Sequence, residues 1–98
     1  MGERDTIRWY ALRGECIVEV PRAETGTKIV HIALDTIDGV TVSTVFLPFD
    51  HGFGEGKPVL FETMVFGGAH DQYQLRYTSM KDALDGHAET VKLVKETK

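Results

Sequence analysis

Apolar and polar positions along residues 29–49 form two strand-like runs, Ile29 to Ile37 and Val40 to Phe49, separated by the pair Asp38-Gly39. An Asp-Gly pair readily adopts positive φ at both central positions of a type I′ turn, which joins two antiparallel strands directly. The pattern therefore predicts a hairpin over residues 29–49, ended by Pro48, which has no N–H to donate to a neighbouring strand. The two-residue turn also sets the register, which pairs Ile37 with Val40, Leu34 with Ser43, Ile32 with Val45 and Val30 with Leu47.

This register divides the hairpin into two unlike faces. One face is apolar and carries Val30, Ile32, Leu34, Val45 and Leu47. The other face is mixed and carries His31, Ala33, Asp35, Val42, Thr44 and Phe46. A mixed face is either half covered by other elements or lines the surface that a partner contacts.

Further strand-like segments lie before and after this hairpin. Residues 7–20 alternate around Arg13-Gly14-Glu15 and are interpreted as an N-terminal hairpin. Residues 59–66 are apolar on both faces apart from Glu62 and Thr63, which is typical of a central strand. Residues 73–78 alternate like a strand with one solvated face, whereas residues 50–57 carry three alternate glycines and favour a loop.

From Ser79 the hydrophobic period changes to that of a helix. The predicted apolar stripe consists of Met80, Leu84, His87, Val91 and Val94. Ser79 followed by Asp82 resembles a capping box, and lysines suit the negative end of the helix dipole, so a helix is predicted over residues 79–96. Gly86 disfavours a helix interior and therefore indicates a close approach of the helix to the sheet.

These elements predict a single α+β domain over residues 1–98. We expect an antiparallel meander sheet of about four to six strands with one C-terminal amphipathic helix packed on one face, because hairpins followed by a helix form such two-layer folds. The placement of the hairpin at 7–20 relative to the hairpin at 29–49 stays open.

Length and charge exclude several classes of function. The 98 residues carry 15 acidic and 11 basic side chains, a net charge of −4, which has the wrong sign for generic binding to nucleic acid. No apolar run reaches the roughly 18–20 residues of a membrane span, and the charged start Met1–Asp5 is no signal peptide. The single cysteine, Cys16, fits a reducing compartment, so a cytoplasmic location without membrane contact is predicted. Within its strand Cys16 is expected to be a small buried thiol.

Four polar residues form the strongest candidate site for chemistry: Asp50, His51, Glu62 and His87. Their spacing matches no metal motif, and the run Gly52-Phe53-Gly54-Glu55-Gly56-Lys57 lacks the spacing and the following helix of a phosphate-binding loop. The sequence therefore predicts no cofactor, no bound metal and no catalytic residue. His87 lies on the apolar stripe, where a buried imidazole bonded to a carboxylate such as Glu62 is the structural interpretation and a general base the functional one.

Six parts of the chain carry a further signal: Val42 to His51, Gly54, Pro58, Leu60 to Gly68, Tyr77-Thr78-Ser79 and Ala83 to His87. Together they resemble a family of small uncharacterised proteins encoded by phages, prophages and bacteria. Members of that family have no established activity. The resemblance implies a small accessory protein, located in the host cytoplasm if phage-borne, that binds a host component.

The sequence thus favours a non-enzymatic binding protein with a protein partner, its binding residues being drawn from Phe49, Asp50, His51, Phe53, Glu62 and His87. Aromatic residues are numerous for so small a sheet, and an exposed subset would form a patch for a partner. One alternative is a nucleotide- or metal-binding hydrolase-like protein that uses Asp50, His51, Glu62 and His87. Another is a self-associating structural protein, such as a homodimer formed through a sheet edge or an uncovered face.

Overall fold

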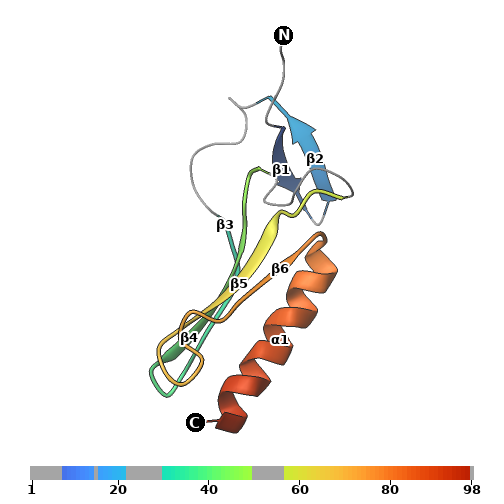
Figure 1. Cartoon of the computed structure of the whole chain (residues 1–98). Helices are drawn as coiled ribbons and strands as arrows, with labels where there is room; N and C mark the ends of the chain where they lie inside the picture. Colours follow the sequence, from blue (N-terminus) through green and yellow to red (C-terminus); the bar gives the residue numbers. More distant parts are fainter. Residues whose placement is uncertain (1–7, 15, 22–29, 50–56, 98) are drawn as a thin grey trace.

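The computed structural model describes residues 8–14, 16–21, 30–49 and 57–97. In these residues β1 (Trp9–Arg13) and β2 (Cys16–Val20) form one hairpin, and β3 (Val30–Ile37), β4 (Val40–Phe46), β5 (Phe61–Phe66) and β6 (Gln74–Tyr77) form a meander sheet, followed by α1 (Met80–Thr97). All neighbouring strands are antiparallel, and α1 contacts each of the four meander strands (Figure 1). The α+β prediction is confirmed, and β5 is a central strand as expected.

The turn between β3 and β4 has the backbone geometry that Asp-Gly predicts. Asp38 and Gly39 have φ angles of 49° and 83°, both positive, as a type I′ turn requires. Ile37 pairs with Val40 and Leu34 with Ser43, so the register next to the turn is also as predicted.

Further from the turn, the predicted register is wrong because β3 contains a bulge. Ala33 pairs with Thr44 but His31 pairs with Val45, which leaves Ile32 as an extra residue. The predicted pairs Ile32–Val45 and Val30–Leu47 therefore do not form, and Val30 lies opposite Phe46 instead. The bulge lets Ile32 pack against the core rather than on the other face of the sheet, and this burial of apolar surface favours it.

The helix begins where the capping residue predicts, but its buried stripe is rotated. The Asp82 N–H donates to Ser79 Oγ at 3.1 Å, which satisfies one of the free donors of the first turn. The buried positions of α1 are Ala83, His87, Thr90 and Val94, whereas Leu84 is 43% exposed. The prediction that Leu84 lies on the buried stripe is therefore wrong. The small residues Ala83 and Gly86 lie towards the sheet instead, because they let the helix backbone approach it more closely than a leucine would.

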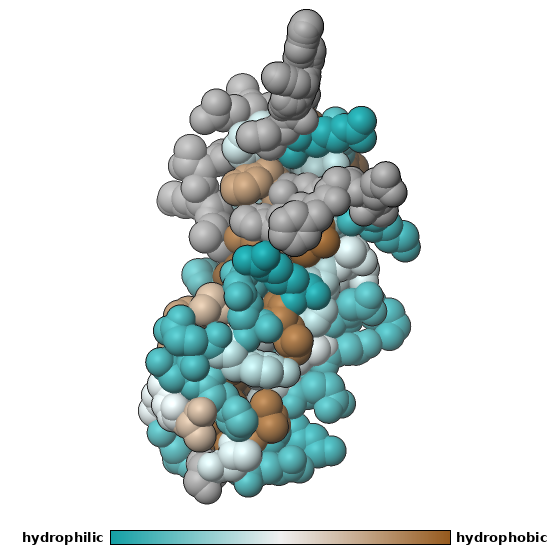
Figure 2. All heavy atoms as spheres, viewed as in Figure 1, coloured by the Kyte–Doolittle hydropathy of each residue, from teal (hydrophilic) through white to brown (hydrophobic). Residues whose placement is uncertain are grey.

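Two groups of buried side chains hold the helix on the sheet. Val42, Val65 and Val94 form one group near the turn between β3 and β4. The other group lies towards the start of the helix and consists of Phe46, Leu60, Phe61 and Ala83. The outward side of α1, at the right of Figure 2, is mostly hydrophilic, as expected of an amphipathic helix on a sheet.

The N-terminal hairpin joins the second group of core residues. Tyr10, Leu12 and Ile17 pack against it, and the Tyr10 N–H donates to the Pro48 carbonyl at 2.7 Å. Cys16 is exposed, so the prediction of a buried thiol is wrong: it sits at the hairpin end, paired with Arg13, beyond the strand positions that reach the core.

Candidate functional site

A chain of polar side chains crosses the interface between helix and sheet. Thr44 and Thr63 lie opposite each other on β4 and β5, both with no exposed surface, and their hydroxyl oxygens are 2.5 Å apart. His87, from α1, places Nδ1 2.7 Å from Thr44 Oγ1 and Nε2 2.7 Å from an Asp35 carboxylate oxygen. At the other end, the Tyr77 hydroxyl donates to Thr63 Oγ1 at 3.0 Å. We call these five residues the buried network.

The hydrogen positions in the buried network follow from its carboxylate end. A carboxylate only accepts hydrogen bonds, so His87 donates from Nε2 to Asp35. With a neutral imidazole, Nδ1 then accepts from the Thr44 hydroxyl, and Thr44 accepts from Thr63. Every buried donor of the network has an acceptor in this arrangement, which explains how a sheet interior accommodates two threonines and a histidine.

Thr44, His87 and Asp35 follow one another like a hydroxyl nucleophile, a general base and an orienting carboxylate. The hydroxyl, however, is closed off from solvent. Thr44 is fully buried and His87 is 6% exposed, so no substrate reaches the hydroxyl that the imidazole would activate. The two ends of the network reach the surface: 55% of the Asp35 side chain is exposed, and Tyr77 is partly exposed. The network therefore acts as a structural clamp between α1 and the sheet.

Burial raises the pKa of the Tyr77 hydroxyl above its ordinary value near 10. We expect the contribution of Tyr77 to stability to be present below about pH 10 and lost as the pH rises through the raised folded-state pKa. Chemical denaturation of the wild type and of Tyr77→Phe at neutral and at alkaline pH measures the difference in their free energies of unfolding. This difference should shrink as the pH rises, and a difference that does not depend on pH would refute the assignment.

Glu62 lies on the opposite face of the sheet from His87. Its carboxylate accepts hydrogen bonds from the Gln74 amide and from Arg76 Nε, the latter at 3.1 Å. The predicted pairing of Glu62 with His87 is therefore wrong, because neighbouring residues of a strand point to opposite faces and Glu62 is adjacent to Thr63, which points towards the helix. Among the described residues, no group of three or more His, Cys, Asp and Glu side chains is placed to hold a metal ion.

The face of the meander sheet turned away from α1 has no helix over it in the described part of the chain. The strand register places three cross-strand rows of side chains on it, and we call this surface the open face. The rows are Thr36, Thr41 and Phe66; Leu34, Ser43, Met64 and Gln74; and His31, Val45, Glu62 and Arg76. Leu34 is 58% exposed and Phe66 45% exposed. Isolated apolar side chains are ordinary on a surface, but these share one face with Val45 and Met64 and form a patch.

The centre of the open face is hollowed into a shallow groove of about 310 Å³. Its lining runs across the three strands β3 to β5 and consists of His31, Ser43, Val45, Glu62, Met64 and Phe66. The Glu62–Arg76 ion pair forms one polar border, with the Glu62 side chain 14% exposed and the Arg76 side chain 43% exposed. The surface therefore combines an apolar middle with a charged and hydrogen-bonding edge.

The other predicted site residues are dispersed or lie beyond the described part of the chain. Phe49 packs edge-on against Trp9, with ring centroids 5.3 Å apart, and belongs to the junction with the N-terminal hairpin. Asp50, His51 and Phe53 lie outside the described residues, as does the glycine-rich run at 50–56. Of the predicted set, Glu62 is on the open face and His87 is in the buried network.

Leu34, Met64 and Phe66 are residues of the open face that the sequence prediction of the site omitted. For Met64 and Phe66 the signal is the apolar character of both faces of residues 59–66, which is typical of a strand buried on both sides. For Leu34 it is the apolar face of the hairpin at 29–49. Only the position of the single described helix shows which of the two faces is left bare.

The described residues contain no helix that is both long and apolar enough to cross a membrane. No family model, curated protein or solved structure matches this chain.

Proposed function

We propose that this protein is a non-enzymatic binding protein whose open face contacts a partner protein. The observation that carries the proposal is the one-sided covering of the sheet: α1 lies on one face, while Leu34 and Phe66 remain 58% and 45% exposed on the other. Exposed apolar patches of this kind, bordered by polar groups, are typical of protein-interaction sites.

The chemistry of the open face defines the partner surface it suits. Its apolar middle complements aliphatic or aromatic side chains, and the groove between Val45 and Met64 accepts a protruding one. The Glu62–Arg76 pair and the Gln74 amide at the border supply hydrogen bonds that give orientation more than affinity. The resemblance to phage and prophage proteins favours a component of the bacterial host as the partner, with both in the host cytoplasm.

The hydrolase alternative receives less support from the described residues. It requires Glu62 and His87 in one site, whereas the two side chains lie on opposite faces of the sheet and have other partners. The candidate nucleophile of the buried network is shielded from solvent. These positions favour binding over catalysis.

Self-association is the second candidate, and a specific observation favours it. β3 is an edge strand of the meander sheet and carries the most exposed large apolar side chain of the open face, Leu34. A second copy of this chain could pair with that edge or stack on the open face, which would bury the same residues. A homodimer and a complex with another protein therefore depend on the same surface and differ in stoichiometry.

Leu34→Asp tests the proposal, with Leu84→Asp as the matched control on the outer side of α1. Both residues are exposed leucines, so each variant adds the same charge without opening the core. A protein captured from bacterial lysate by the wild type and by Leu84→Asp should bind Leu34→Asp at least about thirtyfold more weakly, as expected for a central interface residue.

Sedimentation velocity of the same three proteins separates the two kinds of partner. A dimer of the wild type that Leu34→Asp alone dissociates assigns the open face to self-association. If the captured protein still binds Leu34→Asp, or a dimer persists in that variant, the open face is not the contact surface. The same conclusion follows if Leu84→Asp disrupts binding or dimerisation equally. Thermal unfolding of both variants checks that each remains folded.

A further inference from the structure

The outer edge of β3 is a strand edge without a neighbour in the described part of the chain. β3 is the first strand of the meander sheet, and no described strand lies beyond it. Val30–Ile37 contains no lysine, arginine or proline, residues that often block a strand edge. The opposite edge, β6, has four residues and carries the charged Arg76. Of the two edges, β3 is therefore the one that is open to a further strand.

The turn between β3 and β4 determines which backbone groups of β3 point outwards. Ile37 and Val40 flank this two-residue turn and are the kind of pair that exchanges both backbone hydrogen bonds. Such pairs alternate along a hairpin, so Leu34 and Thr36 belong to pairs without these bonds, and their N–H and C=O groups point away from β4. Both residues are exposed, so a backbone beside them can reach these groups.

The bulge of β3 limits how much of this edge is regular. Ile32 is the extra residue, so the next outward-pointing residue, His31, lies three positions from Leu34 instead of two. A regular partner strand is therefore confined to residues 33–37.

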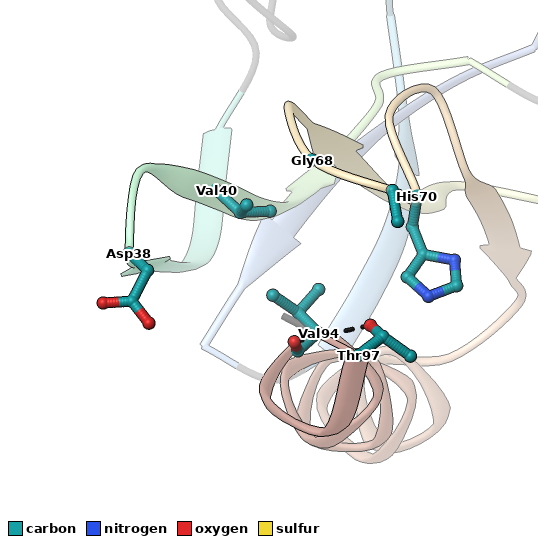
Figure 3. A pocket seen from close by; sticks show the side chains of 7 residues that line it. Asp38, Val40, Gly68, His70, Val94 and Thr97 are labelled. Carbon is teal, nitrogen blue, oxygen red and sulfur yellow. Dashed lines mark hydrogen bonds between the residues drawn. The ribbon is translucent and has the colours of Figure 1, made fainter.

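β3 is held in place before a partner arrives. At the turn, Val40 packs against the buried group that contains Val94, and in Figure 3 Val40 lies above this helix residue. In the middle of β3, the Asp35 carboxylate accepts a hydrogen bond from His87 Nε2 at 2.7 Å. Because the hairpin is anchored to α1 at both places, the addition of a strand requires little ordering of the edge.

The side-chain alternation of β3 sets the side chains that an added strand presents. Leu34 and Thr36 lie on the open face, whereas Asp35 lies on the helix side. Residues of an added strand opposite Leu34 and Thr36 therefore extend the open face, and apolar side chains there cover the exposed Leu34. The residue between them stands opposite Asp35.

Asp35 disfavours a second copy of this chain as the added strand. Antiparallel pairing of two β3 edges through both outward-pointing residues sets Leu34 opposite Thr36, and this register places Asp35 opposite Asp35 of the second copy. Like charges directly opposite each other destabilise a strand pair. A basic side chain is favoured at that position instead, because Asp35 is more than half exposed and a carboxylate has about four acceptor sites, of which His87 occupies one.

We propose that β3 binds an extended segment of the partner protein as an additional antiparallel strand along residues 33–37. The segment has the order apolar, basic, apolar, with its basic side chain opposite Asp35 and its apolar side chains on the open face. Backbone hydrogen bonds to Leu34 and Thr36 supply affinity, and the side chains supply specificity. The added strand rests on the proposed function, because it specifies how the same partner contacts the protein.

Nuclear magnetic resonance titration of the full chain with a short model peptide tests the pairing. The probe is end-blocked Thr-Val-Lys-Val-Thr, whose valines stand opposite Thr36 and Leu34 and whose lysine stands opposite Asp35. We expect saturable shifts of the backbone amide signals of Leu34 and Thr36, and none at Glu89, an exposed residue of α1. The absence of a saturable shift at Leu34 and Thr36 would overturn the inference.

Two N-methylated forms of the probe show whether its backbone carries the binding. Methyl groups on the nitrogens of both valines replace the N–H groups that face β3, and they should weaken binding about tenfold or more. Methyl groups on the nitrogens of the lysine and the last threonine face away from β3 and should change binding less than about twofold. Equal loss with both forms would overturn the added strand.

The same two peptides separate the added strand from the proposed function. If neither form loses binding, side chains alone carry the contact and the added strand is rejected. The proposed function still stands in that case, provided that Leu34→Asp weakens binding of the captured protein and Leu84→Asp does not.

Thr36→Pro and Thr36→Val are a matched pair of variants on the protein side. Proline removes the outward N–H of residue 36 without removing a hydrogen bond to β4, and edge strands tolerate proline at such positions. Thr36→Pro should weaken binding of the probe about fivefold or more, whereas Thr36→Val keeps the N–H and should change binding less than about twofold. Thermal unfolding checks that both variants remain folded. Equal binding by two folded variants would contradict pairing at this edge.

Exchange of the lysine for glutamine in the probe tests the basic side chain. The glutamine form should bind about two- to fivefold more weakly at low salt, as expected for an exposed ion pair with Asp35. A glutamine form that binds as tightly as the lysine form would reject the basic side chain opposite Asp35.

Discussion

Replacing Gly86 by alanine is expected to destabilise the protein by about 1–3 kcal/mol, although alanine is the better helix former. A Cβ at Gly86 would lie 2.5 Å from Cε1 and Cζ of the Tyr77 ring and closer still to its hydroxyl oxygen. The ring cannot move away freely, because its hydroxyl is bonded to Thr63 in the buried network. Chemical denaturation of the wild type and the variant measures the difference in free energy of unfolding.

The double variant Gly86→Ala/Tyr77→Leu shows whether the overlap with Tyr77 is the cause. Removing the ring should make the combined loss smaller than the sum of the single losses by about 0.5–3 kcal/mol. Glu89→Ala, an exposed position on the same helix, should change stability by less than about 0.5 kcal/mol. A stabilised Gly86→Ala would show that α1 does not approach β6 as closely as the structure indicates.

Thr44→Val is expected to cost about 1–3 kcal/mol of stability, although the two side chains have nearly the same shape. The substitution removes the hydroxyl that is bonded to His87 Nδ1, and so leaves a buried ring nitrogen without a partner. Thr41→Val is the matched control on the same strand: Thr41 is partly exposed and faces away from the helix, so its effect should stay within about 0.5 kcal/mol.

The double variant Thr44→Val/His87→Leu tests whether the unpaired His87 nitrogen causes the loss of stability in Thr44→Val. Replacing both partners by apolar groups removes the unsatisfied acceptor, so the double variant should recover part of the stability that Thr44→Val alone loses. The Thr63 hydroxyl loses its Thr44 partner in the single and the double variant alike, so this loss cancels in the comparison, and Asp35 is exposed enough to be solvated. A Thr44→Val variant no less stable than Thr41→Val would reject the clamp role of the buried network.

The two faces of the meander sheet differ in composition and in what covers them. The mixed face of the hairpin, with Asp35 and Thr44, is covered by α1 and satisfied through His87. The face that carries Leu34 and Val45 is the one left open. A polar interior held together by hydrogen bonds thus coexists with an apolar surface, which is the distribution expected when the apolar surface is used for contact.

Local signals in the sequence determined the elements of this fold. The Asp38-Gly39 turn, the cap at Ser79 and the change from a two-residue period to a helical one act over a few residues, and each is present in the structure. Gly86 likewise indicated a close approach, and the structure supplies its partner, Tyr77. These features are predictable because backbone conformation and side-chain periodicity depend on neighbours in the chain.

The candidate sites depend on choices that are not local. The alternation along a strand defines two faces but does not say which one a helix will cover, so neither the exposure of Leu34 nor the burial of Thr44 follows from the pattern. The extra residue Ile32 and the rotation of α1 that exposes Leu84 result from packing between elements. The sequence by itself determined the strands, the turn and the helix, because these follow from contacts within a few residues. Only the tertiary structure decided that His87 joins Asp35 rather than Glu62, because that pairing depends on which face the helix covers.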